Sequence, residues 1–401
     1  MAQSLKRLFL SGDRLFISLR ALSTITALVF ALVYSKHLGV ERRGLLTFIM
    51  TTNLVFSILL ISGISLHLRN LVRNSDVEPI LTTYLVLVLT FSSLTPFLNY
   101  LVLRAYESVF NSAIPNNLLF VSMVYCFFST LSYGMHDALL LIKSIRIASI
   151  LDFGVVIIQI LSYLTLVYSG ETSYFVSVLI SLSISYLVMV VSSLLLVLYV
   201  FTPKINFSLD SLRQLISDSS TPTFINITSQ LLERIDKVFL GIQVGVADLG
   251  KFSTNQSIIG IVRFIPDALT KLSLARDTNY LRNKFLSART LFVFAFVILS
   301  ITEGTSLFTH FVLGAEWELP LTLLFAITLL EFMRGLHSLV VMNAVRANVY
   351  AKLKRITLVQ SIIGLLVLPI AIHFFGLWGS IFTSLAILIM GVGFLRNYVN
   401  E

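Results

Sequence analysis

Long apolar segments follow one another along the whole chain, and they constrain its fold more than any other feature of the sequence. A helix needs about 20 consecutive apolar residues to cross the hydrocarbon core of a bilayer. About twelve such segments are present, at residues 14–35, 44–66, 80–103, 114–135, 149–168, 174–200, 222–241, 251–272, 290–312, 320–343, 356–374 and 380–396. Backbone groups in lipid must be hydrogen-bonded within their own segment, so we expect transmembrane α-helices. Charged residues make up 12% of the chain, against about 25% in soluble domains, which agrees with an all-α integral membrane protein.

A short glycine motif recurs at an offset of 206 residues. It reads Gly-Val-x-x-x-Gly and begins at Gly39 and again at Gly245, each time in a polar gap between two apolar segments. The offset is close to half the chain length, so we interpret it as an internal duplication of the kind found in transporters. This predicts two six-helix lobes, residues 1–206 and 207–401, related by a pseudo-two-fold axis along the membrane normal. A chance match of two short motifs is the alternative.

The positions of lysine and arginine predict the orientation. Basic residues concentrate at 276–289 and 346–355 and near the N-terminus, which we expect to face the cytoplasm together with both termini. Trp317 and Trp378 then fall at outer boundaries, where aromatic belts form. The net charge of +9 is explained as a topology signal, and no nucleic-acid partner is expected because no basic soluble domain is present.

Other classes of site are disfavoured. No Walker motif is present, and Cys126 is the single cysteine, which excludes an internal disulfide. The six histidines are scattered without metal-ligand spacing, so we expect neither a metal nor another cofactor. The first apolar segment is long enough to span and lacks a small-residue cleavage site, so we interpret it as the first helix and not as a signal peptide.

The order of several motifs resembles one known family. The motifs are Lys-His-Leu-Gly-Val-Glu-Arg-Arg-Gly at 36–44, Leu-Leu-Glu-Arg-Ile-Asp-Lys-Val-Phe-Leu-Gly at 231–241, Val-Gly-Val-Ala-Asp-Leu-Gly-Lys-Phe-Ser at 244–253 and Phe-Ile-Pro-Asp-Ala at 264–268. Together they resemble the bacterial polysaccharide (O-antigen and capsule repeat-unit) flippases of the multidrug/oligosaccharidyl-lipid/polysaccharide exporter (MOP) superfamily. A departure is Lys251-Phe252, where these exporters usually place a tyrosine.

The resemblance implies a MATE-like fold and a transport function. The chain would move undecaprenyl-diphosphate-linked oligosaccharide units from the inner to the outer leaflet of the bacterial inner membrane, by alternating access, in polysaccharide and lipopolysaccharide biosynthesis. Its partners would be this lipid-linked substrate, membrane lipids, a polysaccharide polymerase and a chain-length regulator. Helices 1, 2, 7 and 8 would line a central cavity, which implies the substrate-binding residues Arg20, Asn53, Arg234, Lys237 and Arg263.

Charges inside the predicted spans are costly and therefore indicate function or pairing. Arg20 has no acidic residue three or four positions away, and it is predicted to bind the diphosphate through a bidentate guanidinium contact. The alternative is that Arg20 extends to the inner surface. Three other cations have an acidic residue on the same helix face, so a local structural ion pair is the alternative to a functional role; the pairs are Glu233 with Lys237, Arg263 with Asp267, and Glu331 with Arg334.

Asp236 and Glu303 are candidates for coupling to protons or sodium. Neither has a basic residue on its own helix face, and a buried unpaired carboxyl group can exchange protons near neutral pH. A protonated acid that is hydrogen-bonded to a neighbouring helix is the alternative for Glu303. Asp152 likewise lacks a basic neighbour on its own helix.

Two other functions compete with the flippase. An ion-coupled multidrug or cation antiporter of the same fold should have an acidic cavity, whereas the predicted cavity is basic or balanced. A membrane enzyme such as a glycan polymerase should carry a large outer loop, whereas the predicted outer loops are short, so we expect no enzyme activity. The sugar unit, the coupling ion and the oligomeric state are left open.

Overall fold

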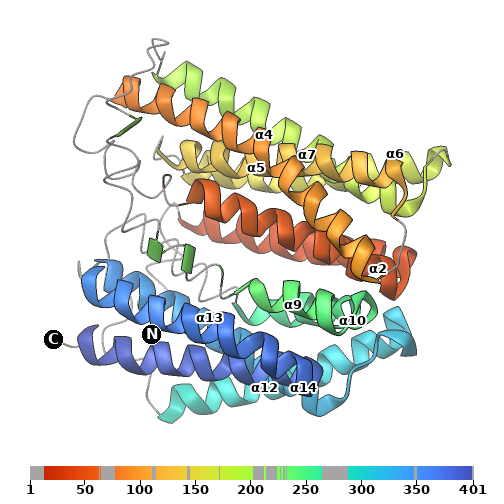
Figure 1. Cartoon of the computed structure of the whole chain (residues 1–401), viewed down its shortest axis with the longest axis vertical. Coiled ribbons are helices and arrows are strands. Elements are labelled where there is room, and N and C mark those ends of the chain that lie inside the picture. The colour runs from red at the N-terminus through yellow and green to blue at the C-terminus, as the bar shows by residue number, and fades with distance from the viewer. Residues whose placement is uncertain are drawn as a thin grey trace. The chain divides into compact units, whose positions relative to one another are not determined.

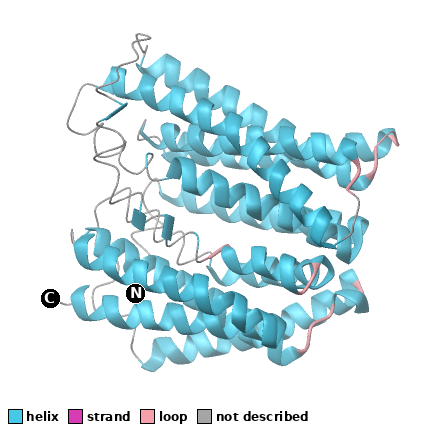
Figure 2. Ribbon diagram, viewed as in Figure 1, coloured by secondary structure: helices cyan, strands magenta, loops and turns pink. Residues whose placement is uncertain are grey.

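The computed structural model describes residues 13–62, 77–110, 114–141, 145–170, 172–201, 233–263, 288–346 and 350–399, with a few isolated positions between them. Within this part of the chain all regular structure is helical (Figure 2). The first half contains α2 (Asp13–Ser57), the π-helical turn η1 (Ile58–Ser62), α4 (Val77–Phe110), α5 (Asn116–Leu141), α6 (Ile145–Ser169) and α7 (Tyr174–Phe201), as labelled in Figure 1. The second half contains α9 (Ile235–Gln243), α10 (Val246–Ile259), η2 (Gly260–Arg263), α12 (Ala288–Phe308), η3 (Thr309–Leu313), η4 (Ala315–Trp317), α13 (Leu321–Arg346) and α14 (Tyr350–Val399).

Eight of the described helices are long and apolar enough to cross a membrane. Two of them, Ala21–Ile61 and Ala351–Leu395, have 41 and 45 residues, about twice the length that a bilayer core requires. Each is interrupted at a glycine with positive φ, Gly39 (φ 73°) or Gly376 (φ 57°). Each therefore consists of two spans joined end to end, as the sequence predicted. Predicted segments 222–241 and 251–272 are described in part, by α9 and α10.

Packing divides the chain into two units. Unit 1 is Met1–Leu45 with Phe239–Glu401, and unit 2 is Leu46–Val238. The division falls inside α2 because its first part packs on helices of the second half: Leu32 is buried against Leu313 and Trp317. The lobe boundary predicted at residue 206 stays a prediction.

Unit 2 has a core between α4 and α5. Leu81, Tyr84 and Val88 of α4 are buried together with Leu131 of α5. The Tyr84 hydroxyl donates to the carbonyl of Gly134 at 2.9 Å. A Cβ at Gly134 would lie 2.5 Å from Val88 Cγ1, so this glycine is needed for the close packing of the two helices.

Unit 1 contains a buried tryptophan where an aromatic belt was expected. Trp317 is completely buried, so the expectation that its ring lies at the lipid boundary is wrong. The ring packs against Leu32 and Leu313, and the Trp317 carbonyl accepts a hydrogen bond from Asn255 Nδ2 at 3.0 Å. The turn at η4 therefore folds the ring into the protein. Trp378 is half-buried and stacks on Phe382, with ring centroids 5.2 Å apart.

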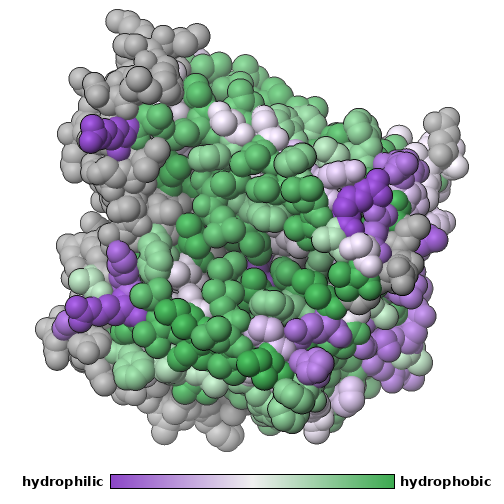
Figure 3. Space-filling model, viewed as in Figure 1, coloured by the Kyte–Doolittle hydropathy of each residue, from purple (hydrophilic) through white to green (hydrophobic). Residues whose placement is uncertain are grey.

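The outer surfaces of the helices are apolar. Figure 3 shows hydrophobic residues over most of the face in view. Large side chains such as Leu89, Phe97, Phe120 and Leu161 are exposed. Such a surface would be a liability in water, whereas it matches the hydrocarbon of a bilayer.

Candidate functional site

The two copies of the glycine motif lie against each other in unit 1. A Cβ built on Gly44 would lie 1.6 Å from the carbonyl oxygen of Val246, and a Cβ on Gly250 would lie 2.1 Å from the carbonyl oxygen of Val40. No side chain fits into either space, so α2 and α10 meet backbone to backbone. The contact is reciprocal, because the second glycine of each copy meets the valine of the other. This is the arrangement that a duplicated motif related by a two-fold axis produces.

The first glycine of each copy has a different role. Gly39 (φ 73°) interrupts α2, and Gly245 (φ 112°) precedes the first turn of α10. A Cβ on either would meet nothing within 4 Å, so the backbone conformation and not the space requires glycine there. Gly39 and Gly245 are thus required by backbone conformation, whereas Gly44 and Gly250 are required by the close approach of the two helices.

Arg43 is buried beside this contact. Its Nη1 donates to the Tyr34 hydroxyl at 3.0 Å, and its guanidinium carbon lies 5.0 Å from the centroid of that ring. Tyr34 in turn packs edge-to-face on Phe30. Arg43 is thus held by Tyr34, which lies in the part of α2 before Gly39. The spacing of nine residues gives no signal in the sequence, because the Gly39 interruption brings the two side chains together.

A cluster of polar side chains surrounds Glu331 in unit 1. Arg334 Nη1 donates to Glu331 Oε1 at 2.7 Å, which confirms the predicted pair on α13. The same oxygen accepts a bond from Gln256 Nε2 of α10 at 2.6 Å. Arg263 Nη1 lies 3.5 Å from the other oxygen, Glu331 Oε2. We call Gln256, Arg263, Glu331 and Arg334 the Glu331 cluster.

The Glu331 cluster holds two guanidinium groups around one carboxylate. The formal charges of the two guanidinium groups and the carboxylate sum to +1 at neutral pH. Glu331 and Arg334 are almost completely buried, whereas the Arg263 side chain keeps 19% of its surface exposed. Arg263 is therefore the most exposed of the three charged members of the cluster, with Glu331 as a buried counter-ion beside it. The pairing predicted between Arg263 and Asp267 lies outside the described residues.

A second polar contact continues along α13. His337 Nε2 lies 3.3 Å from Gln360 Nε2, which also donates to the carbonyl of Ile387 at 2.8 Å. A Cβ on Gly391 would lie 2.1 Å from Gln360 Nε2, so Gln360 is confined between α13 and the second half of α14. The buried side of α13 therefore carries three polar residues in successive turns: Glu331, Arg334 and His337.

Asn53 lies in unit 2 and is completely buried. Its Oδ1 accepts a bond from Thr130 Oγ1 at 3.3 Å, and this hydroxyl also contacts Ser57 at 2.8 Å and Thr95 at 3.0 Å. Its Nδ2 has no hydrogen-bond partner among the described residues. Asn53 is thus a buried hydrogen-bonding group of unit 2, and its role in a substrate cavity stays a prediction.

Arg234, Asp236 and Lys237 lie together where α9 begins. Arg234 and Lys237 are half-buried, whereas Asp236 is completely buried. Asp236 Oδ1 accepts the backbone N–H of Lys237 at 2.8 Å. A carboxylate in the first turn of a helix is stabilised by the unpaired N–H groups there, which gives Asp236 a structural reason for its position.

The other predicted site residues differ in their surroundings. Arg20 lies in α2, and its side chain is outside the described part of the structure. Glu303 lies in α12 on an exposed face, between Leu299 and Leu307. Whether these residues share one cavity with Asn53, Arg234, Lys237 and Arg263 stays a prediction.

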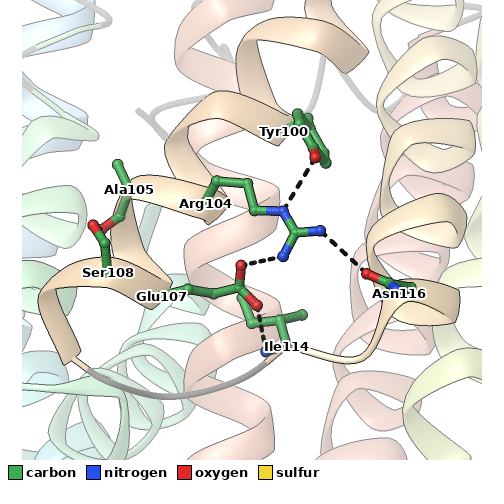
Figure 4. Close-up of polar contacts among 7 residues, drawn as sticks. All are labelled: Tyr100, Arg104, Ala105, Glu107, Ser108, Ile114 and Asn116. Carbon is green, nitrogen blue, oxygen red and sulfur yellow. Dashed lines mark hydrogen bonds and ion pairs between the residues drawn. The ribbon is translucent and has the colours of Figure 1, made fainter.

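One ion pair and one hydrogen-bond network in unit 2 join neighbouring helices or their connection. His136 Nε2 of α5 lies 3.1 Å from Asp152 Oδ1 of α6, so Asp152 has a partner from another helix that the sequence did not reveal. Figure 4 shows Arg104 at the end of α4, where it bonds Tyr100, Glu107 and Asn116 at 3.1, 2.6 and 3.1 Å. Glu107 also accepts the N–H of Ile114 at 2.6 Å, and these bonds fix the connection to α5.

Comparison with solved structures identifies the fold. The lipid II flippase MurJ, in an inward closed conformation, superposes with a TM-score of 0.71 at 16% identity, covering 96% of this chain and 87% of MurJ. An inward-facing multidrug resistance MATE family transporter of the MOP superfamily gives a TM-score of 0.65 at 13% identity, covering 96% of this chain and 98% of that one.

The chain has the MOP-superfamily fold. A MOP superfamily transporter from Pyrococcus furiosus, described as having a binding pocket of reverse polarity, matches with a TM-score of 0.57 at 13% identity, covering 96% of this chain and 93% of that one. No protein-family model matches the sequence, and no curated protein sequence matches it significantly. Within the described residues of this MOP fold, no group of three or more His, Cys, Asp or Glu side chains could hold a metal ion.

Proposed function

We propose that this protein is a flippase for undecaprenyl-diphosphate-linked oligosaccharide units, moving them from the inner to the outer leaflet of the bacterial inner membrane by alternating access. The observation that carries the proposal is the Glu331 cluster, in which two guanidinium groups share one carboxylate. A diphosphate head group requires cationic hydrogen-bond donors that stay charged when partly dehydrated, and guanidinium meets both requirements.

Arg263 is the residue of the cluster that would bind the diphosphate. Glu331 lies 3.5 Å from Nη1 of Arg263, and its other oxygen is already bonded by Arg334 and Gln256. Glu331 thus orients Arg263 from one side. Arg20, Asn53, Arg234 and Lys237 are proposed to complete the binding site, with Arg20 meeting the substrate from the inner leaflet.

The polarity of the cluster separates this function from cation transport. A site for organic cations needs excess negative charge, and the Glu331 cluster has the opposite sign. One structural neighbour supports polarity as a distinguishing property, since its title connects the reverse polarity of its binding pocket with a different function. The inner-membrane location, the cytoplasmic termini and the partnership with a polymerase and chain-length regulator are part of the same proposal.

The alternative is an ion-coupled multidrug or cation antiporter. The MATE neighbours share the fold, and Asp236 is a completely buried acid. Asp236 and Glu303 are the proposed coupling residues in either function. In Glu303 the carboxyl group is exposed on an apolar face, so Asp236 is the stronger candidate.

The test compares binding of an anionic and a cationic ligand. Purified protein in nanodiscs is titrated with a polyprenyl diphosphate oligosaccharide and, separately, with tetraphenylphosphonium. Loss of a charge-assisted hydrogen bond costs about 1.5–3 kcal/mol, so Arg263→Gln should weaken diphosphate binding about ten- to a hundredfold. Arg104→Gln is the matched control, because Arg104 also pairs with one glutamate but belongs to the α4–α5 connection. Tighter binding of the cation than of the diphosphate by the wild-type protein would favour the antiporter.

A further inference from the structure

A carboxylate lies on the exposed apolar face of α12, close to the middle of its span. Phe296–Leu313, which covers most of α12 and the turn η3, is long and apolar enough to cross a membrane. Glu303 lies within about 3 Å of the centre of that part along the helix axis, since a helix rises about 1.5 Å per residue. No hydrogen bond or ion pair joins Glu303 to any residue that the structure describes.

The two faces of α12 have opposite surroundings. Thr302 and Thr305 are buried, and Thr302 Oγ1 donates to Thr328 of α13 at 3.0 Å. The other face carries Phe296, Leu299 and Leu307, which are 65%, 54% and 58% exposed. A face lined by large apolar side chains is typical of contact with hydrocarbon and not of a water-filled cavity. Glu303 therefore lies on the face of α12 that would meet hydrocarbon.

Small residues border the carboxylate on the same face. Ser300 and Gly304 are exposed and four residues apart, and a Cβ on Gly304 would meet nothing within 4 Å. This small-x-x-x-small spacing allows the backbone of another transmembrane helix to approach closely. The protein's own helices leave that place empty in the described structure.

We propose that this face of α12 is a docking site for a transmembrane helix of another protein that carries a lysine or arginine at mid-depth. An ionisable group in the bilayer is costly without a partner, and a cation is the group that a carboxylate pairs with. A second copy of this chain fits less well, because a symmetric dimer on this face would bring two carboxyl groups together, and like charges at close range cannot both ionise. Ser300 and Gly304 allow the backbone of the partner helix to approach closely, and Glu303 favours a partner helix that carries a positive charge.

The test uses the full-length protein in liposomes with synthetic transmembrane peptides. Each peptide has about 20 leucine and alanine residues, with lysine or leucine at its centre, and carries a fluorophore for energy transfer to the labelled protein. We expect the lysine peptide to associate about three- to tenfold more strongly than the leucine peptide, the range typical of interhelical polar contacts in membranes. Glu303→Gln should reduce this preference to nearly onefold.

Substitutions separate charge from shape. Gly304→Ile should weaken binding of both peptides, because it fills the place of close approach. Gly154→Ile in α6, where added atoms also meet open space, is the matched control and should leave both unchanged. Equal binding of the two peptides by the wild-type protein would overturn the proposal, as would a homodimer crosslinked through Ser300→Cys. A coupling role for Glu303 gives a different result, in which Glu303→Gln stops transport while the peptide preference persists.

Discussion

Gly44 and Val246 meet backbone to backbone, with room for no atom beyond the glycine hydrogens: a Cβ on Gly44 would lie 1.6 Å from the Val246 carbonyl oxygen. The reciprocal contact of Gly250 with Val40 is nearly as close, at 2.1 Å. Two motifs 206 residues apart in sequence therefore fold into one symmetric crossing of α2 and α10.

Gly44→Ala should destabilise the protein. The added methyl group collides with backbone and not with a flexible side chain, so the helices must move apart, at a cost of about 1–3 kcal/mol in the free energy of unfolding. Thermal denaturation in detergent measures the effect as a lower Tm. Gly154→Ala, which meets open space, is the control and should leave the Tm unchanged or slightly raise it. An unchanged Tm for Gly44→Ala would show that the crossing is not closed in the folded protein.

Gly245→Ala should also destabilise the protein, in this case because of the backbone conformation at residue 245. Its φ of 112° lies in a region that side chains with a Cβ rarely adopt, at a cost of about 1–3 kcal/mol. Gly260→Ala is the matched control on the same helix, because Gly260 has helical φ and ψ (−55°, −16°) and open space around it. Equal Tm values for the two variants would contradict this explanation.

Glu331→Gln should be strongly destabilising. It removes the carboxylate that two guanidinium groups share and leaves buried positive charge, which typically costs about 3–5 kcal/mol. The double variant Glu331→Gln with Arg334→Gln should recover part of this loss, because the most deeply buried cation is removed as well. The free energies of unfolding of the single and double variants measure how far the effect of Glu331 depends on Arg334. A double variant less stable than the single one would show that Arg334 stabilises the fold independently of Glu331.

Crosslinking across the glycine contact should stop transport if the two halves rock. Cysteines replacing Val40 and Val246, in a Cys126→Ser background that removes the chain's single cysteine, are joined by a short bismaleimide. Surface polysaccharide is then measured in a flippase-deficient strain, with uncrosslinked protein and each single-cysteine variant as controls. Undiminished transport after complete crosslinking would exclude opening at this contact.

Arg20→Ala should weaken binding of the lipid-linked diphosphate about ten- to a hundredfold, because one charge-assisted hydrogen bond is lost. Arg20→Lys should restore only part of the affinity, since ammonium keeps the charge but not the bidentate geometry. Complementation of surface polysaccharide, normalised to protein level, and direct binding measure both variants. Full activity of Arg20→Ala at equal protein level would leave only the interpretation that Arg20 extends to the inner surface.

The sequence by itself determined the helices, their approximate ends and the importance of the glycine motif. The length of an apolar run and the spacing of glycines are local properties, and a bilayer leaves helix as the single way to satisfy the backbone of such runs. The pair Glu331–Arg334 could also be predicted from the sequence, because residues three apart on a helix are neighbours.

Only the tertiary structure decided which face of each helix is buried. In water a helix shows its core face by an apolar stripe, whereas in lipid both faces are apolar and the pattern carries little information. The sequence could therefore not reveal that Trp317 and Arg43 are buried or that Glu303 is exposed. The partners of Arg263 and Asp152, which are Glu331 and His136, come from other helices, and their meeting depends on how the helices pack.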